Sequence, residues 1–313
     1  SNGYFYNFLQ LNGQINTNGP TSINNAQWWS WRALQALTEA QPILQTINPT
    51  LATSTNDAVN KLITRIKTDQ ASLPQTTTTA YGVTIPQWLP AGSGTDQAAT
   101  LILGLIPYAT SNSDSITSAY IRRLADGIVL MQAGSEANFP FGCILSWQNT
   151  WHAYGADQPL ALLLAGQFLH DTSYTSKALL MINQFFPWLL NQGMLSSFSV
   201  SAANNQFTAT AQSAYDQIAY GVRPLVFAAI EAFAETKDPK YSDMAGQLAA
   251  WFFGKNVANK PMYSTGNGIC FDAISSGANI NLNSGAESTI EALLTMERVE
   301  QYPEVMAALN KYR

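Results

Sequence analysis

An aspartate–glutamine pair recurs three times along this chain at a nearly constant interval. Asp96-Gln97, Asp157-Gln158 and Asp216-Gln217 each open a stretch of helical apolar periodicity, and their aspartates are 61 and 59 residues apart. Residues 94–104 and 155–166 also resemble each other, because both run from Gly through Asp-Gln into Ala- and Leu-rich sequence. A period of helix–turn–helix length that returns an acid to the same point predicts repeated helical hairpins.

The repeat is longer than the 33–47 residues of common α-solenoid units, which favours hairpins closed into a ring. Glu287, 71 residues after Asp216, occupies the corresponding position in a later helix. Segments such as 101–106 and 160–166 are apolar on nearly every side and therefore belong in an interior. We expect an all-α fold, an (α/α) toroid of five to six helical hairpins with minor short strands in loops. A single domain spans residues 1–313.

Apolar periodicity and capping residues also predict where the individual elements lie. Short strands or extended loops are expected at 81–89 and 198–200. The helices are predicted at 28–44, after the polar run 54–57, and at 96–109, 115–132, 157–170, 174–191, 216–236, 239–255, 286–301 and in a short tail from Pro303. The starts of alternate helices would gather at one end of the ring and line one cleft.

The chain is poor in charge. Charged residues make up 11% of it, against about 25% in typical soluble domains, so Asn, Gln, Ser and Thr must cover much of the surface. This composition indicates an exported protein, extracellular or at a cell surface. The net charge of −5 and the absence of any basic run exclude a nucleic-acid surface. No apolar stretch approaches the roughly 18 residues of a membrane span.

The two cysteines and two histidines fit no metal spacing, so no metal site is expected. Cys143 and Cys270 are candidates for a disulfide if the chain folds in an oxidising compartment. Two separate buried thiols are the open alternative. No phosphate loop or dinucleotide fingerprint is present, and we therefore expect no cofactor.

Five segments together resemble the six-hairpin glycosidase superfamily, the (α/α)6 toroid. They are residues 3–9, 25–32, 147–158, 251–256 and 268–289. The last two segments also resemble a helical domain of uncharacterised extracellular archaeal proteins that is attached to some bacterial sugar-transfer proteins. The resemblance covers most of the chain. It implies an oligo- or polysaccharide as the binding partner.

Inverting glycosidases of this architecture pair a carboxylic acid with a carboxylate about 6.5–9.5 Å away that activates water. The catalytic candidates are acids at the expected open end of the ring: Glu287, Asp157, Asp216 and Asp272. Glu287 is the preferred proton donor, with Asp157 or Asp216 as base. Helix capping is the alternative for the Asp-Gln aspartates, and a capping carboxylate would have a low pKa and be a poor acid.

Aromatic side chains are predicted near the same helix ends, and they suit a sugar ring because they combine a flat apolar face with a polar group. Core packing is the alternative for each of them. The candidate substrate-binding residues are Trp28, Trp88, Trp147, Trp151, His152, Tyr154, Tyr215 and Tyr220.

The leading hypothesis is a glycoside hydrolase-like protein that acts on an extracellular glycan by the inverting, two-carboxylate mechanism. The rival is a non-catalytic glycan-binding or cell-surface structural protein on the same fold, which would include assembly at a cell surface. A polysaccharide lyase or sugar epimerase is a lesser alternative, since Arg32 and Arg223 are the only cations placed to bind a uronate carboxylate.

Overall fold

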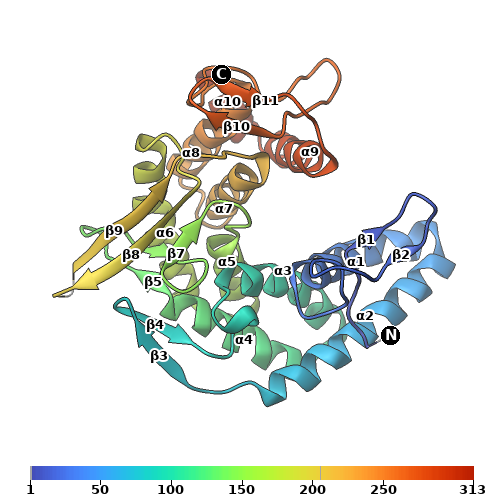
Figure 1. Ribbon diagram of the computed structural model, residues 1–313. Coiled ribbons are helices and arrows are strands. Elements are labelled where there is room, and N and C mark those ends of the chain that lie inside the picture. The colour runs from blue at the N-terminus through green and yellow to red at the C-terminus, as the bar shows by residue number, and fades with distance from the viewer. Residues whose placement is uncertain (1, 205) are drawn as a thin grey trace.

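The computed structural model describes residues 2–204 and 206–313, and this part of the chain is dominated by α-helices (Figure 1). The described residues form ten α-helices, which confirms the expected all-α class. Their bounds are α1 (Trp28–Ile47), α2 (Pro49–Ser72), α3 (Thr95–Asn112), α4 (Ser115–Leu130), α5 (Gln158–Leu169), α6 (Thr172–Asn191), α7 (Ala219–Thr236), α8 (Pro239–Ala249), α9 (Ala286–Glu300) and α10 (Pro303–Tyr312). Short 3-10 helices lie at Pro90–Gly92 and Ala250–Phe253.

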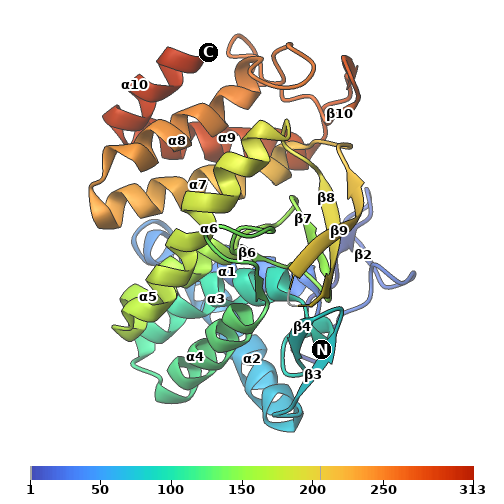
Figure 2. The same ribbon diagram turned by 90° about the vertical axis from the view of Figure 1, so that its left-hand side faces the viewer.

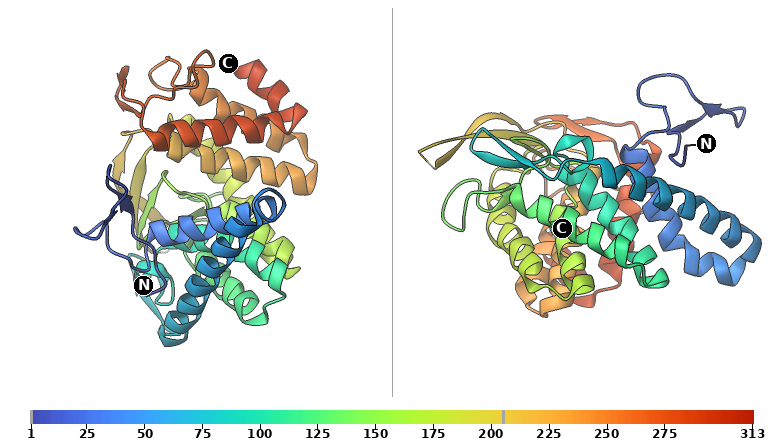
Figure 3. Two further views of the ribbon diagram at one scale, coloured as in Figure 1. Left: turned by 90° about the vertical axis from the view of Figure 1, so that its right-hand side faces the viewer. Right: turned by 90° about the horizontal axis from the view of Figure 1, so that it is seen from below.

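Successive helices pack as hairpins: α1 with α2, α3 with α4, α5 with α6, α7 with α8, and α9 with α10. The odd-numbered helices also pack side by side in the order α1, α3, α5, α7, α9, and so form the inner layer. In the described part of the chain α9 does not pack closely against α1, and the ring of five hairpins is open between them (Figure 3). This count lies within the predicted five to six hairpins.

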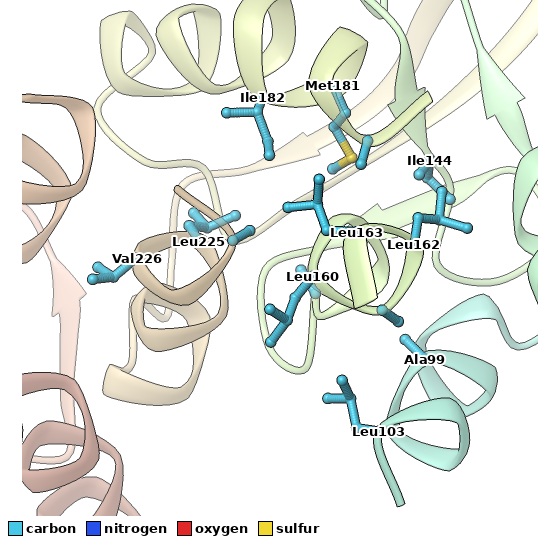
Figure 4. Close-up of a cluster of buried hydrophobic side chains, with 14 of the residues drawn as sticks. Ala99, Leu103, Ile144, Leu160, Leu162, Leu163, Met181, Ile182, Leu225 and Val226 are labelled. Atoms are coloured by element: carbon cyan, nitrogen blue, oxygen red, sulfur yellow. The ribbon is translucent and has the colours of Figure 1, made fainter. Parts of the chain in front are cut away.

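The three middle inner helices, α3, α5 and α7, bury most of their side chains, whereas α1 and α9 each bury one face. Figure 4 shows leucines of α5 directed to different neighbours, with Leu163 toward Met181 of α6 and Leu162 toward Ile144. Leu162 and Leu163 are fully buried. Each such side chain contributes about 1.5–3 kcal/mol through burial. Helices α3, α5 and α7 are apolar on nearly every side because neighbouring elements cover every side of them.

Short antiparallel strands gather at one end of the helices (Figure 2). Three of them form a sheet in the order β7-β8-β9, and the others pair as two-stranded hairpins. The bounds are β1 (Phe8–Leu9), β2 (Ile15–Asn16), β3 (Thr77–Ala80), β4 (Val83–Pro86), β5 (Gln132–Ala133), β6 (Cys143–Ile144), β7 (Thr150–His152), β8 (Ser197–Ala203), β9 (Gln206–Ser213), β10 (Ala273–Ser276) and β11 (Asn279–Asn281). None of the helices described is long and apolar enough to cross a membrane.

Two predicted helix starts were wrong. α2 begins at Pro49 rather than after residue 57, because the side chain of Asn48 accepts a bond from Leu51 N–H and Pro49 fits the first helical position. α7 begins at Ala219 rather than at residue 216, because the backbone of Gln217 pairs with Ile274 and is thereby held extended.

The glutamines explain why the Asp-Gln pair recurs. All three are buried, and each bonds to a side chain of a neighbouring part of the ring. Gln97 Oε1 accepts from Trp31 Nε1 at 3.0 Å, Gln158 Nε2 donates to Thr95 Oγ1 at 3.1 Å, and Gln217 Oε1 accepts from Trp251 Nε1 at 3.1 Å. Gln97 and Gln158 thus link adjacent hairpins, and Gln217 does so through Nε2, which donates to the Gly193 carbonyl after α6 at 2.8 Å. The three aspartates differ from one another in their contacts.

Candidate functional site

The first turns of four inner helices bring charged and aromatic side chains together at one end of the ring. We call this group the mouth cluster. It comprises Trp28 and Arg32 of α1, Asp157 at the start of α5, Tyr220 and Arg223 of α7, and Glu287 and Glu291 of α9. The cluster has a buried half and an exposed half, which differ in how their charges are paired.

The buried half consists of one arginine between two carboxylates. Both terminal nitrogens of Arg223 donate to Asp157, each at 3.2 Å, while its Nε donates to Glu291. All three side chains are at most 10% exposed. Burial raises the pKa of Glu291 although Arg223 opposes the shift. The same two carboxylates raise the pKa of Arg223 against the effect of its own burial, so the guanidinium stays charged.

The exposed half is a loosely paired arginine and glutamate. Arg32 Nη1 lies 3.5 Å from Glu287 Oε2, and their side chains are 40% and 55% exposed. The Arg32 guanidinium lies over the Tyr220 ring, 4.2 Å from its centroid, and 5.9 Å from the Trp28 centroid. Stacking on Tyr220 fixes the plane of the guanidinium while solvent still reaches its edge.

Asp96, His152 and Tyr154 contact one another in sequence beside the mouth cluster. His152 Nε2 lies 3.0 Å from Asp96 Oδ2, and its Nδ1 donates to the Tyr154 carbonyl at 2.9 Å. Because a carbonyl only accepts, Nδ1 is the donor to it, and Nε2 faces the Asp96 carboxylate. The imidazole stacks on the Tyr154 ring at 3.9 Å with planes 10° apart. His152 therefore has no free ring nitrogen, and it supports one face of the Tyr154 ring.

Tyr154 extends the aromatic surface of the mouth. Its side chain is 45% exposed, and its ring centroid lies 6.5 Å from that of Trp28 and 6.4 Å from that of Tyr220. Gly155 lets these rings approach, because a Cβ there would lie 2.9 Å from atoms of both Trp28 and Tyr220. Burial and the charge of Asp96 raise the pKa of the Tyr154 hydroxyl.

Two predicted catalytic acids lie outside the cluster. Asp272 Oδ1 accepts from Gly285 N–H at 2.7 Å and from Ser288 Oγ at 2.6 Å, so it caps the start of α9. Asp216 is exposed and makes no hydrogen bond or ion pair with any residue the structure describes. Of the four acids singled out from the sequence, Asp157 and Glu287 are the two that reach the cluster.

The remaining predicted aromatics do not join the mouth cluster. Trp151 is fully buried against Phe185 and Phe198, which is the core-packing alternative. The indole N–H of Trp88 donates to the Arg123 carbonyl at 2.9 Å and that of Trp147 to the Ala91 carbonyl at 3.3 Å. The Tyr215 carbonyl accepts from the hydroxyls of Ser196 and Ser213, and this part of the chain is held by the β8–β9 hairpin.

The disulfide candidate is corrected by the structure, since both cysteines are free and buried. The backbone of Cys143 pairs with Ala133 in the β5–β6 sheet, whereas the backbone of Cys270 forms an isolated β-bridge with Tyr263 in a separate loop. Burial raises the pKa of both thiols, to about 12 for Cys270, so they remain protonated. Within the described residues no group of His, Cys, Asp and Glu could hold a metal ion.

Glu291 was not among the site residues predicted from the sequence. Its position offered a signal, because Glu291 lies on the same face of α9 as Ala292 and Thr295, which are buried. An ionisable side chain among residues of a buried face needs a partner of opposite charge. Arg223, the only cation in the first turns of α7, was that partner.

No family model matches the sequence, and no curated protein matches it. Two solved structures are similar in fold. One is a family 76 glycoside hydrolase from a bovine Bacteroides thetaiotaomicron strain, with a TM-score of 0.57 and 13% identity over 98% of this chain and 64% of that one. The other is a family 76 α-mannanase from Bacteroides thetaiotaomicron, with a TM-score of 0.53 and 14% identity over 89% of this chain and 71% of that one.

This chain thus spans less than two thirds of the length of the first structure. The similarity in fold extends over most of this chain and therefore includes most of its helical hairpins. The chain therefore has the six-hairpin glycosidase-like fold found in family 76 glycoside hydrolases, with five hairpins in its described residues.

Proposed function

We propose that this protein binds an extracellular glycan at the mouth cluster. The observation that carries the proposal is the exposed half of the cluster, in which Trp28 lies next to the Arg32–Glu287 pair, together with the Tyr154 ring beside Trp28. Aromatic faces stack on the C–H faces of a sugar ring, and a loosely paired arginine and glutamate offer a donor and an acceptor to its hydroxyls. Because one of the structures similar in fold is an α-mannanase, α-mannan is the first ligand to test.

Hydrolysis of the glycan is the second candidate function, and one observation favours it. Burial raises the pKa of Glu291, as in carboxylic acids that donate a proton in catalysis. In that scheme Glu287 or Glu291 would protonate the leaving oxygen and Asp157 would activate water. The pairing of charges weighs against it, because Arg223 engages both oxygens of Asp157 and contacts Glu291 as well.

A lyase or epimerase has less support than either function. Such a reaction needs a base with an available lone pair next to the substrate. Both ring nitrogens of His152 are occupied by Asp96 and the Tyr154 carbonyl. Arg223 is likewise engaged by two carboxylates, so Arg32 alone would be left for a uronate.

One experiment tests binding and hydrolysis together. The protein is run through gels containing single polysaccharides, α-mannan among them, and the same polysaccharides are assayed for released reducing ends at acidic and neutral pH. We expect retardation by at least one glycan and its loss in Tyr154→Ala, without released ends. Released ends that disappear in Glu287→Gln would establish hydrolysis instead. Both functions would be refuted if no polysaccharide retarded the protein and no polysaccharide released reducing ends.

A further inference from the structure

A pocket lies away from the mouth cluster, at the other end of the first hairpins. We call it the far pocket. It has a volume of about 480 Å³ and is enclosed by the later turns of α1 and α3 and the first half of α2. Volumes of 300–1,000 Å³ are usual for small-molecule sites. Trp28 and Arg32 of the mouth cluster stand at the opposite end of α1.

The far pocket is polar but carries no ionisable acid or base among its lining residues except the Tyr108 phenol. Its polar groups are side-chain amides and hydroxyls: Gln41, Gln45, Asn56, Asn112, Thr38 and Thr53. Pro42 and Pro107 add flat apolar surface next to the half-buried Tyr108. A pocket of this chemistry offers no counter-charge to a phosphate, a carboxylate or an amine.

Two acceptors of α1 next to the pocket are affected in different ways, one on the backbone and one on a side chain. Pro42 has no N–H, so the Thr38 carbonyl one turn earlier loses its helical hydrogen bond. Gln41 Nε2 donates to the Ala52 carbonyl at 3.1 Å, while its Oε1 is buried and has no partner among the described residues. Because Gln41 Oε1 is buried, the other amides and the hydroxyls of the lining are the groups that would meet a ligand's hydroxyls.

We propose that the far pocket binds a neutral sugar or short neutral oligosaccharide, independently of the mouth cluster. The proline and tyrosine surfaces take the apolar face of the ring, and the side-chain amides and hydroxyls of the lining take its hydroxyls. This site goes beyond the proposed function, because it would hold a second part of a glycan or a separate sugar on the opposite side of the ring.

The test follows the side-chain amide signals of Gln41, Gln45, Asn56 and Asn112 by 1H–15N NMR while mannotriose is added. We expect saturable shifts of these signals, with a dissociation constant of about 1 mM or lower. Thr53→Trp fills the pocket from an exposed position and should abolish the shifts. Tyr108→Ala should weaken binding about tenfold or more, which corresponds to 1.4 kcal/mol.

Two controls separate this site from the mouth. Thr110→Ala alters an exposed α3 residue outside the pocket and should leave the shifts unchanged. Tyr154→Ala removes the mouth platform and should leave them unchanged as well, even if the mouth binds no glycan at all. The proposal is overturned if mannotriose, maltotriose and cellotriose all leave the four amides unmoved. It is also overturned if Thr53→Trp keeps the full shifts, or if sodium sulfate reproduces them.

Discussion

Two arginines of the mouth cluster lie a few ångströms from the same tyrosine and yet have different surroundings. Arg223 is buried, and three of its nitrogens are engaged by Asp157 and Glu291. Arg32 is half-exposed, meets Glu287 at 3.5 Å and stacks on Tyr220 at 4.2 Å. The first arginine joins α5, α7 and α9, whereas the second is available to solvent.

The difference separates structure from recognition within one cluster. A charge pair that is removed from water on both sides stabilises the fold only while it is complete, because each lost partner leaves an uncompensated charge. An exposed pair stabilises little, and a ligand can replace it at low cost. We therefore assign the buried half to holding the inner helices and the exposed half to ligand contact.

The largest effect is expected from Arg223→Met. This change leaves Asp157 and Glu291 buried without a cation, and the free energy of unfolding should fall by about 3–5 kcal/mol. Arg32→Met is the matched control, and it should cost about 1 kcal/mol or less because its ion pair is exposed. Urea unfolding of both variants measures the difference. Equal losses would remove the distinction between the two halves.

The pH dependence of stability tests the buried half further. Burial raises the pKa of Glu291 above its ordinary 4.5, so the folded state holds this proton more tightly than the unfolded state. The contribution of Glu291 is fully present below pH 4.5 and is lost as the pH rises through its folded pKa. The free energy of unfolding of the wild type minus that of Glu291→Gln should therefore decrease as the pH rises, by at most about 1.4 kcal/mol per pH unit. Urea unfolding of both proteins at several pH values measures this difference. A difference that stays constant or grows with pH would contradict a raised pKa of Glu291 in the folded state.

A smaller effect is expected from the support of Tyr154. Asp96→Asn weakens the hold on His152 and should loosen the tyrosine platform, lowering glycan affinity about fivefold, or roughly 1 kcal/mol. His152→Phe keeps the stacked ring and should retain more affinity than His152→Ala. Asp216→Asn is the control, since Asp216 is exposed. Calorimetric titration with the glycan found in the screen distinguishes these variants, and an unchanged affinity in His152→Ala would contradict the role.

No effect is expected from reduction. Because Cys143 and Cys270 are free and buried, dithiothreitol should leave the urea midpoint unchanged. A disulfide between them would stabilise the chain by about 4–5 kcal/mol in the entropic view. A clear loss of stability on reduction would show that the two thiols are bridged in the purified protein.

The hairpin architecture could be predicted because its signals are local. The Asp-Gln period, the all-round apolar character of the inner helices and the residues at helix ends follow from the chain itself. Helix starts at Pro49 and Ala219 were missed for different reasons: the first depends on a side-chain cap at Asn48, and the second on a backbone pair with Ile274, 57 residues away from Gln217.

The candidate site could be predicted in outline only. The Asp-Gln period predicted that Asp157 and Glu287 lie at one end of the ring. It could not show that Arg223 binds Asp157, since these two residues are 66 positions apart. Nor could it distinguish Asp272, which caps α9, from an acid that faces a ligand. Pairing of charges between distant helices arises from the packed ring and leaves no periodic trace in the sequence.

The most direct test of the division within the mouth cluster is a pair of titrations with the glycan identified by the gel screen. Wild type and Tyr154→Ala are compared by calorimetry, and their urea midpoints are measured on the same preparations. We predict an affinity at least about tenfold lower in Tyr154→Ala, equivalent to 1.4 kcal/mol, with the midpoint unchanged. Full affinity in Tyr154→Ala, or a weaker affinity that only accompanies lost stability, would contradict the assignment of the exposed half to ligand binding.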